Sequence, residues 1–117
     1  MSSLVTLTIT PEFEPECGAP SPSRVISGNP TAKTWILDQA CEDSIHTGIW
    51  EATPGETRAI KGDTFEFCHI LSGVVEVIED GGLPVRYEAG QSFLLKPGFV
   101  GVWKTIETVR KIFVVCE

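Results

Sequence analysis

The sequence lacks the features that would assign it to several common classes of protein. Its Lys and Arg residues are scattered and the net charge is −7, so it has no basic stripe of the kind that binds a phosphate backbone. No apolar stretch approaches the roughly 20 residues that span a bilayer. The first residues have neither the basic start nor the apolar run of a signal peptide. We therefore expect no nucleic-acid partner, no membrane partner and a cytoplasmic protein.

Close cysteine pairs and long helical patterns are also missing. Cys17, Cys41, Cys68 and Cys116 include no CxxC pair, whereas zinc ribbons and thiol redox sites use such pairs. Reduced thiols are the expected state. No segment keeps an apolar period of about 3.6 residues for three turns, so we expect no substantial helix.

What the chain does contain is proline in its first part and short β-prone runs in the rest. Residues 10–34 hold five of the eight prolines, which disfavour helices and central strands. We interpret residues 1–34 as an extended N-terminal arm, with "LVTLTI" at residues 4–9 as an apolar, β-prone segment for an edge strand. Residues 35–117 form the predicted barrel domain.

Runs rich in Val, Ile, Phe and Thr alternate with turn signals from Trp35 onward, and this spacing is typical of a β-sandwich or barrel. "EDGG" at residues 79–82 predicts a hairpin turn. "TFEFCHIL" and "VVEVIE" are predicted as two strands, and so are "GVWK" and "VRKIFVVC". The chain is long enough for one domain with a single core.

Four stretches carry a resemblance to a known family: "GIWEATPGETR", "EFCHILSGVVEVIEDGG", "YEAGQSFLLKPGFVGVW" and "ETVRKIFVV". They cover most of residues 48–115 and resemble the cupin superfamily. They are most similar to the short single-domain branch that includes ureidoglycine aminohydrolase-like and ethanolamine-utilisation cupins. The resemblance implies an all-β, double-stranded β-helix fold, the jelly-roll barrel also called RmlC-like. We also expect a homodimer, because a small barrel would otherwise leave the apolar segment "LVTLTI" as an exposed edge. The resemblance favours the same state, since dimers are common among cupins.

The metal-binding motifs of cupins are only partly present. Glu66 and Gly73 match the end of the first motif, and Gly101 stands where the second motif has its histidine ligand. The two histidines of the first motif fall on Ile60 and Gly62 in one register, or on Ala59 and Lys61 in the other. Of four expected ligands only the glutamate remains, so we predict no metal and no other cofactor.

Neighbours of Glu66 on the same strand do not restore a metal site. Side chains alternate between the two faces of a strand, so an inward Glu66 implies an inward Cys68 and an outward His69. One carboxylate and one thiol fall short of the three or more protein ligands usual in catalytic metal sites.

The same alternation predicts the rest of an interior pocket. Trp103 and Thr105 face inward if the position of Gly101 does, and Trp50 matches a tryptophan that similar sequences carry before the first motif. In "VRKIFVV" both faces are apolar, so alternation leaves open whether Lys111 or Arg110 is interior. The family pattern favours Lys111. The predicted ligand-binding residues are Trp50, Cys68, Trp103 and Lys111, with Glu66 as the candidate catalytic residue.

These residues predict a barrel that binds a small polar metabolite. In one interpretation the chain is an atypical, metal-independent enzyme, in which a desolvated Glu66 has a raised pKa and acts as general acid or base. Trp50 and Trp103 would stack on the substrate and Lys111 would hold an anionic group. One alternative is a non-catalytic small-molecule binding or regulatory module. A further alternative, implied by the resemblance, is a metal-dependent hydrolase similar to ureidoglycine aminohydrolase.

Overall fold

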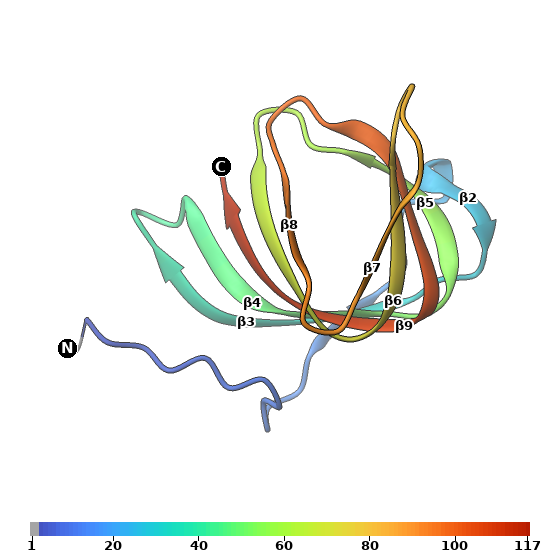
Figure 1. Ribbon diagram of the computed structural model, residues 1–117. Helices are drawn as coiled ribbons and strands as arrows, with labels where there is room; N and C mark the ends of the chain where they lie inside the picture. Colours follow the sequence, from blue (N-terminus) through green and yellow to red (C-terminus); the bar gives the residue numbers. More distant parts are fainter. Residues whose placement is uncertain (1–2) are drawn as a thin grey trace.

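The computed structural model describes residues 3–117, whose strands form one antiparallel sheet that curls into a barrel (Figure 1). Within these residues there is a single short 3₁₀ turn and no α-helix, so no helix is long and apolar enough to cross a membrane. The prediction of an all-β barrel is confirmed. The elements are β1 (Glu16–Gly18), η1 (Pro22–Arg24), β2 (Val25–Gly28), β3 (Ala32–Ala40), β4 (Ile45–Ala52), β5 (Gly55–Ile60), β6 (Phe65–Glu79), β7 (Val85–Glu88), β8 (Ser92–Leu95) and β9 (Val100–Cys116).

The last strand, β9, organises the sheet. On one side its first half pairs with β5 and its second half with β4, and on the other side it pairs with β6 along most of its length. β6 in turn pairs with β7 and β8. The strands therefore curl around an interior (Figure 1). Side chains from β4, β5, β6, β8 and β9 line or fill this interior.

Two pairs of predicted strands turn out to be single long strands. "TFEFCHIL" and "VVEVIE" together form β6, and "GVWK" and "VRKIFVVC" together form β9. The pairing of β6 with β9 shifts in register after Ile70, Ser72 and Val74. Such shifts are typical of β-bulges, which bend a strand without ending it. The prediction of separate strands was wrong because Ser72 and Gly73 read as a turn, whereas here they are part of a bend.

Strand alternation holds well in the first half of β6. Glu66, Cys68 and Ile70 are buried, with exposed fractions of 6%, 0% and 0%, while Phe67 and His69 are only partly buried on the other face. The "EDGG" turn is also present, since residues 80–82 connect β6 to the segment that leads into β7 and the amide of Gly82 donates to the carbonyl of Glu79. These features confirm the inward row on β6 and the hairpin.

The proline-rich arm contributes two of the edge strands of the sheet. Among the described strands, β1 pairs only with β3 and β2 pairs only with β5, while β7 and β8 are edge strands beside β6. Residues 4–9 lie outside the strands, and Leu4 and Ile9 are 84% and 48% exposed. The arm is tied to the sheet where the Trp35 indole donates to the carbonyl of Phe13 and Arg110 donates to the carbonyl of Ile9, each at 2.9 Å. The homodimer expected from this segment stays a prediction.

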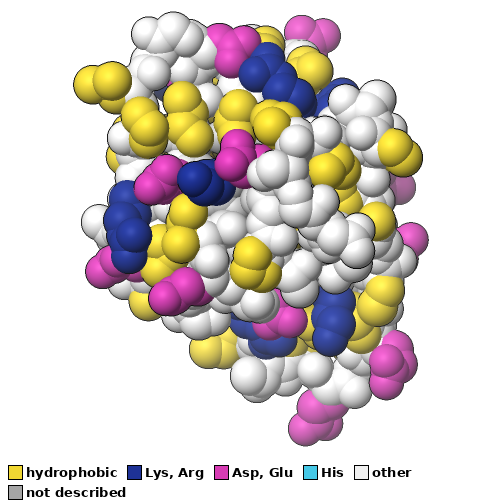
Figure 2. All heavy atoms as spheres, turned by 90° about the vertical axis from the view of Figure 1, so that its right-hand side faces the viewer, with side chains coloured by type: hydrophobic (Ala, Val, Ile, Leu, Met, Phe, Trp, Pro, Cys, Tyr) yellow, Lys and Arg dark blue, Asp and Glu magenta, His cyan; other side chains and the backbone are white. Residues whose placement is uncertain are grey.

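Charged side chains of both signs cover the outside of the barrel around β2 and β5. Figure 2 shows that basic and acidic groups on this face lie next to one another instead of forming one continuous basic patch. Arg58 of β5 donates two hydrogen bonds to Asp80, at 3.0 and 2.8 Å, and Lys104 lies 3.8 Å from Glu56. Such exposed pairs contribute little to stability.

We predict that Gly73→Ala destabilises the barrel more than Gly81→Ala does. Both glycines have a left-handed backbone, with φ of 82° and 84°, where a side chain costs about 1–2 kcal/mol. A Cβ at Gly73 would also collide with the backbone of Thr108 and Val109, whereas a Cβ at Gly81 meets nothing within 4 Å. Urea denaturation measures both free energies of unfolding. Equal losses for the two variants would contradict the role of Gly73 in the bend.

Candidate ligand-binding site

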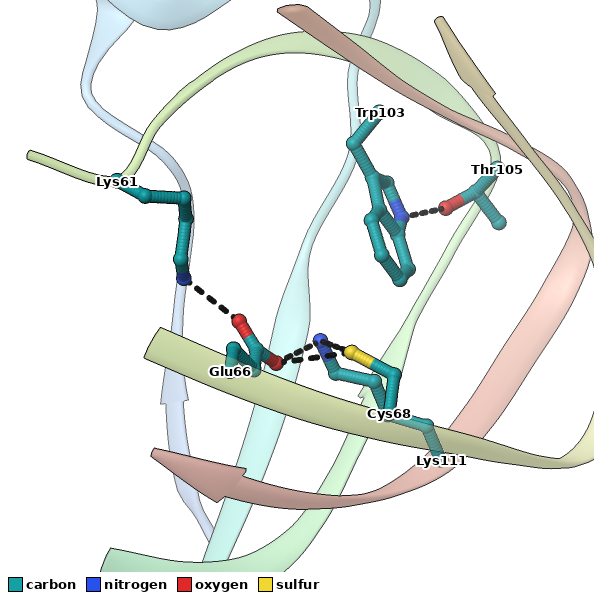
Figure 3. Close-up of polar contacts among 6 residues, drawn as sticks. All are labelled: Lys61, Glu66, Cys68, Trp103, Thr105 and Lys111. Carbon is teal, nitrogen blue, oxygen red and sulfur yellow. Dashed lines mark hydrogen bonds and ion pairs between the residues drawn. The ribbon is translucent and has the colours of Figure 1, made fainter. Parts of the chain in front are cut away.

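A buried carboxylate at the start of β6 is the centre of the interior polar cluster. Glu66 is 6% exposed. Its Oε2 accepts a hydrogen bond from Lys111 Nζ at 2.6 Å and its Oε1 accepts one from Lys61 Nζ at 2.7 Å. The thiol of Cys68 donates to Oε2 at 3.2 Å. Figure 3 shows Lys61 and Lys111 reaching Glu66 from different parts of the chain, while Cys68 lies beside it on the same strand.

Lys111, and not Arg110, faces the interior. The Lys111 side chain on β9 is 6% exposed, and its Nζ lies 4.5 and 4.4 Å from the ring centroids of Trp50 and Trp103. The ammonium group therefore combines a carboxylate partner with two aromatic faces, the usual requirement for a buried charge. Arg110 points the other way, where its Nε donates to Glu51 at 3.2 Å.

Lys61 is the member of the cluster that the sequence analysis did not identify. It follows β5 in a turn, and its side chain is 16% exposed. The turn is held in place by a hydrogen bond from the Lys61 amide to the carbonyl of Phe99 and by one from the Gly98 amide to the carbonyl of Gly62. Strand alternation says nothing about a residue in a turn, so the only signal was the second register of the first cupin motif. That register puts Lys61 at a histidine position.

Two indole rings form the wall above the charged cluster. Trp50 of β4 and Trp103 of β9 meet edge to face, with ring centroids 5.4 Å apart. The Trp103 Nε1 donates to Thr105 Oγ1 at 3.1 Å (Figure 3), which satisfies the polar atom of a residue that is only 7% exposed. The structure thus brings all five residues proposed for the site from sequence to one place.

Four of these five residues, all except Cys68, line a cavity of about 310 Å³, which we call the charged cavity. Its size lies at the small end of the range of roughly 300–1,000 Å³ typical of small-molecule pockets. Its wall is otherwise mostly apolar, with two threonines. The lining residues are Thr34, Trp50, Thr57, Ala59, Lys61, Glu66, Leu95, Trp103, Lys111, Phe113 and Val115.

The protonation state of Glu66 differs from the one expected. Burial alone would raise the pKa of Glu66, but the positive charges of Lys111 and Lys61 and their hydrogen bonds outweigh burial and lower it to about 2. The expectation of a raised pKa was wrong because the sequence did not reveal that two ammonium groups share this carboxylate. Glu66 is ionised at neutral pH and is a weak base.

The other two buried groups are also fixed in one protonation state. Burial raises the pKa of the Cys68 thiol to about 12, with a further contribution from the adjacent Glu66. Burial acts to lower the pKa of Lys111, but its interactions with Cys68 and Glu66 raise this pKa by more than burial lowers it. The net shift of the Lys111 pKa is upward. At neutral pH Glu66, Cys68 and Lys111 are a carboxylate, a thiol and an ammonium group, and neither Cys68 nor Lys111 is a ready nucleophile.

The residues present do not fit a divalent metal of the kind cupins hold. Among residues 3–117 no three His, Cys, Asp or Glu side chains lie close enough together to hold a metal ion. The carboxylate of Glu66 already binds two ammonium groups, which would repel a cation. At Gly101 a Cβ would collide with the carbonyl of Ile78, so this backbone has no room there for a ligand side chain.

Both histidines lie away from the cluster. The Nδ1 of His69 is 2.7 Å from Ser92 Oγ on the outward side of β6 and β8. A ring nitrogen of His46 is 2.6 Å from the carbonyl of Asp43, in the turn between β3 and β4. Each ring thus has a local structural partner, and neither residue lines the charged cavity.

We predict that Glu66→Gln lowers the free energy of unfolding by about 3–5 kcal/mol, because it leaves the Lys111 ammonium buried without a counter-ion. The double variant Glu66→Gln/Lys111→Met should recover most of that loss in urea denaturation. Glu51→Gln is the matched control, since Glu51 pairs with Arg110 at the partly exposed surface and its loss should cost about 1 kcal/mol or less. A Glu66→Gln variant as stable as Glu51→Gln would contradict the account.

We also predict that the purified protein retains no stoichiometric transition metal, because two ammonium groups already pair with Glu66, the one buried carboxylate among residues 3–117. Elemental analysis of protein prepared without chelators or a metal-binding tag tests this. A stoichiometric amount of zinc, manganese, nickel or iron that disappears in Glu66→Ala would overturn it and support metal-dependent hydrolysis.

Comparison with known proteins agrees with the fold. The family model described as the EutQ-like cupin domain matches residues 40–113. A DUF861-family protein of unknown function from Pseudomonas syringae pv. tomato strain DC3000 superposes with a TM-score of 0.82 at 23% identity, covering 93% of this chain and 46% of that one. EutQ of Clostridium difficile gives 0.64 at 19% identity, covering 74% and 63%.

A DUF861-family protein from Thermotoga maritima is more similar in sequence, with 37% identity and a TM-score of 0.52 over 56% of this chain and 73% of that one. The chain spans less than two thirds of the length of the Pseudomonas and Clostridium proteins. No curated protein sequence matches it significantly. The family match covers more than half of the chain and agrees with the curled antiparallel sheet, so this protein belongs to the EutQ-like cupin domain family.

Proposed function

We propose that the protein is a small-molecule binding cupin whose charged cavity takes a polar metabolite through an anionic group, most simply a carboxylate. The observation that carries this proposal is the charge balance of the cavity. Two ammonium groups, Lys61 and Lys111, face one carboxylate, Glu66, and within the described part of the chain no other charged residue lines the cavity. One net positive charge is therefore left inside a chain whose own net charge is −7.

The two lysines have hydrogen-bond donors to spare. Each ammonium group carries three N–H donors. Lys61 uses one on Glu66, while Lys111 uses one on Glu66 and a weaker one on Cys68. The remaining donors can bind a second carboxylate without displacing Glu66. Charge-assisted bonds of this type contribute about 1.5–3 kcal/mol each.

The indole rings suit the uncharged part of such a ligand. Trp50 and Trp103 each present aromatic surface to the cavity next to the Lys111 ammonium. Aromatic side chains contribute much of the apolar contact area in small-molecule sites, while a few polar groups fix the orientation of the ligand. The site therefore combines an anion-binding end with an apolar wall.

The protonation states favour binding over acid–base catalysis by Glu66. A group is most effective as general acid or base when its pKa is near the working pH, whereas the pKa of Glu66 is about 2. The thiol of Cys68, with a pKa of about 12, supplies little thiolate. These values support the non-catalytic binding module over the atypical enzyme that uses Glu66.

We predict that the protein binds butyrate in preference to butylamine, which has a similar size but the opposite charge. Isothermal titration calorimetry measures the affinities. Lys61→Met should weaken butyrate binding by about tenfold or more, because a charge-assisted bond is lost while the pair between Glu66 and Lys111 remains. The matched control is Lys104→Met, since Lys104 pairs with Glu56 outside the cavity.

Intrinsic fluorescence reports where the ligand binds. A ligand in the charged cavity should change the emission of Trp50 and Trp103. Trp35 lies outside this cavity, where its indole donates a hydrogen bond to the carbonyl of Phe13. The change in emission should therefore persist in the Trp35→Phe variant. Equal binding of butyrate and butylamine, or equal effects of the two lysine variants, would contradict the proposal. NMR spectra showing that the bound ligand is chemically changed would support an enzyme instead.

A further inference from the structure

A second cavity adjoins the charged one. Its volume is about 380 Å³. The two cavities share four lining residues: Thr34, Trp50, Thr57 and Trp103. The edge-to-face pair of Trp50 and Trp103 thus lies between them, and a ligand that extends from one cavity to the other would pass these rings.

Small side chains make room for the second cavity. Its wall includes Ala32 and Ala52 on β3 and β4, and Ala52 is only 4% exposed. The wall is completed by residues 16–20, which comprise β1 and the segment after it, and by Pro30, Thr31, Gly55 and Thr105. The outer side of this cavity is therefore formed by the proline-rich arm, which was predicted from sequence as an extended arm with a possible edge strand.

The second cavity lacks the lysines of the first. Of the residues that the structure describes, Glu16 is the one charged residue in its lining, and it is exposed on β1. An anionic group here would find no ammonium partner and would be repelled by Glu16. An uncharged group would instead contact alanine, proline and indole surface, whose burial is favourable.

Two hydroxyl groups are available where the cavities meet. Thr34 and Thr57 are half-buried, and within residues 3–117 neither side chain makes a hydrogen bond. Thr34 lies opposite Trp50 in the sheet, and Thr57 lies opposite Trp103. They can bond a hydroxyl or amide group in the middle of a ligand that spans both cavities.

We propose that the two cavities form one elongated site for a monocarboxylic acid with an uncharged tail. This rests on the proposed function, because the carboxylate binds Lys61 and Lys111 in the charged cavity. The tail extends past the indole pair into the second cavity. Glu16 makes the site selective, because it disfavours a second carboxylate at the far end of the ligand.

The test is calorimetry with acetate, butyrate, hexanoate and octanoate, together with suberate, the dicarboxylate of the same length as octanoate. We expect the affinity to rise about fourfold for each methylene group that enters the second cavity. This factor follows from the free energy of transferring one methylene group from water to an apolar environment. Octanoate should bind more tightly than suberate, and Glu16→Gln should reduce that difference while leaving acetate binding unchanged.

Filling the second cavity with a larger side chain tests the contribution of the ligand's tail to the affinity separately from that of its carboxylate. Ala32→Phe should bring octanoate down to the affinity of butyrate without weakening acetate binding. The matched control is Ala40→Phe, at the exposed far end of the same strand and outside both cavities. The comparison of suberate with octanoate on the unaltered protein needs no variant, so it stands even if Ala32→Phe does not fold.

The outcomes separate this inference from the proposed function. If acetate binds and Lys61→Met weakens it, but octanoate binds no more tightly, the charged cavity is a ligand site and the elongated site is wrong. Equal affinities for suberate and octanoate would likewise overturn the inference. If no carboxylate of any length binds, both the proposed function and the elongated site are wrong.

Discussion

The ion cluster around Glu66 is the interaction on which the interior of this barrel depends. A carboxylate that is 6% exposed is costly to bury alone, and so is the ammonium group of Lys111 beside it. The ion pair between Glu66 and Lys111 offsets much of the cost of burying each charge. Lys61 adds a second ion pair to Glu66 from a third segment of the chain. Because β6, β9 and the turn after β5 each supply one charge, the cluster also fixes how these segments lie relative to one another.

The fold brings the charges together through the long strand β9 and its bulged partner β6. Lys111 lies opposite Trp50 on one neighbour and Ile70 on the other, so the three side chains share the inward face of the sheet. On that face the Lys111 ammonium group reaches Glu66. The bend at Gly73 lets the second half of β6 follow β9 around the barrel. A flat strand would continue in one direction and leave the interior open.

The sequence predicted those parts of the site that follow from strand alternation. Once Glu66 was taken as interior, Cys68 and the outward His69 followed from the period of two, and Trp103 and Thr105 followed in the same way on β9. Lys111 needed the family pattern, since both faces of its strand are apolar. The inward position of Lys61 could not be predicted from the two-residue period of a strand, because Lys61 lies in a turn. Its position depends on hydrogen bonds to a second turn that is distant in sequence.

The same limit explains the errors in the fold and in the pKa of Glu66. Ser72 and Gly73 have the composition of a turn, and only the pairing with β9 distinguishes a bend from a reversal. The pKa of a buried carboxylate depends on the charges within a few ångströms of it, and the sequence revealed one of the two lysines. Burial alone would raise the pKa of Glu66 and favour its protonated, uncharged form. Burial together with two ammonium groups lowers the pKa and favours the ionised form.

The presence of ammonium groups around the Glu66 carboxylate changes what this position in a cupin barrel can do. A divalent cation both attracts anions and coordinates water, whose pKa it lowers. An ammonium group attracts anions and donates hydrogen bonds, but it has no coordination position for water. Lys61 and Lys111 thus supply positive charge that can attract an anion, and neither offers a coordination position for activating water. The pKa values of Glu66, about 2, and of Cys68, about 12, are both far from neutral pH, where a general acid or base is most effective. This contrast with a metal centre is the physical basis on which we propose ligand binding for this barrel.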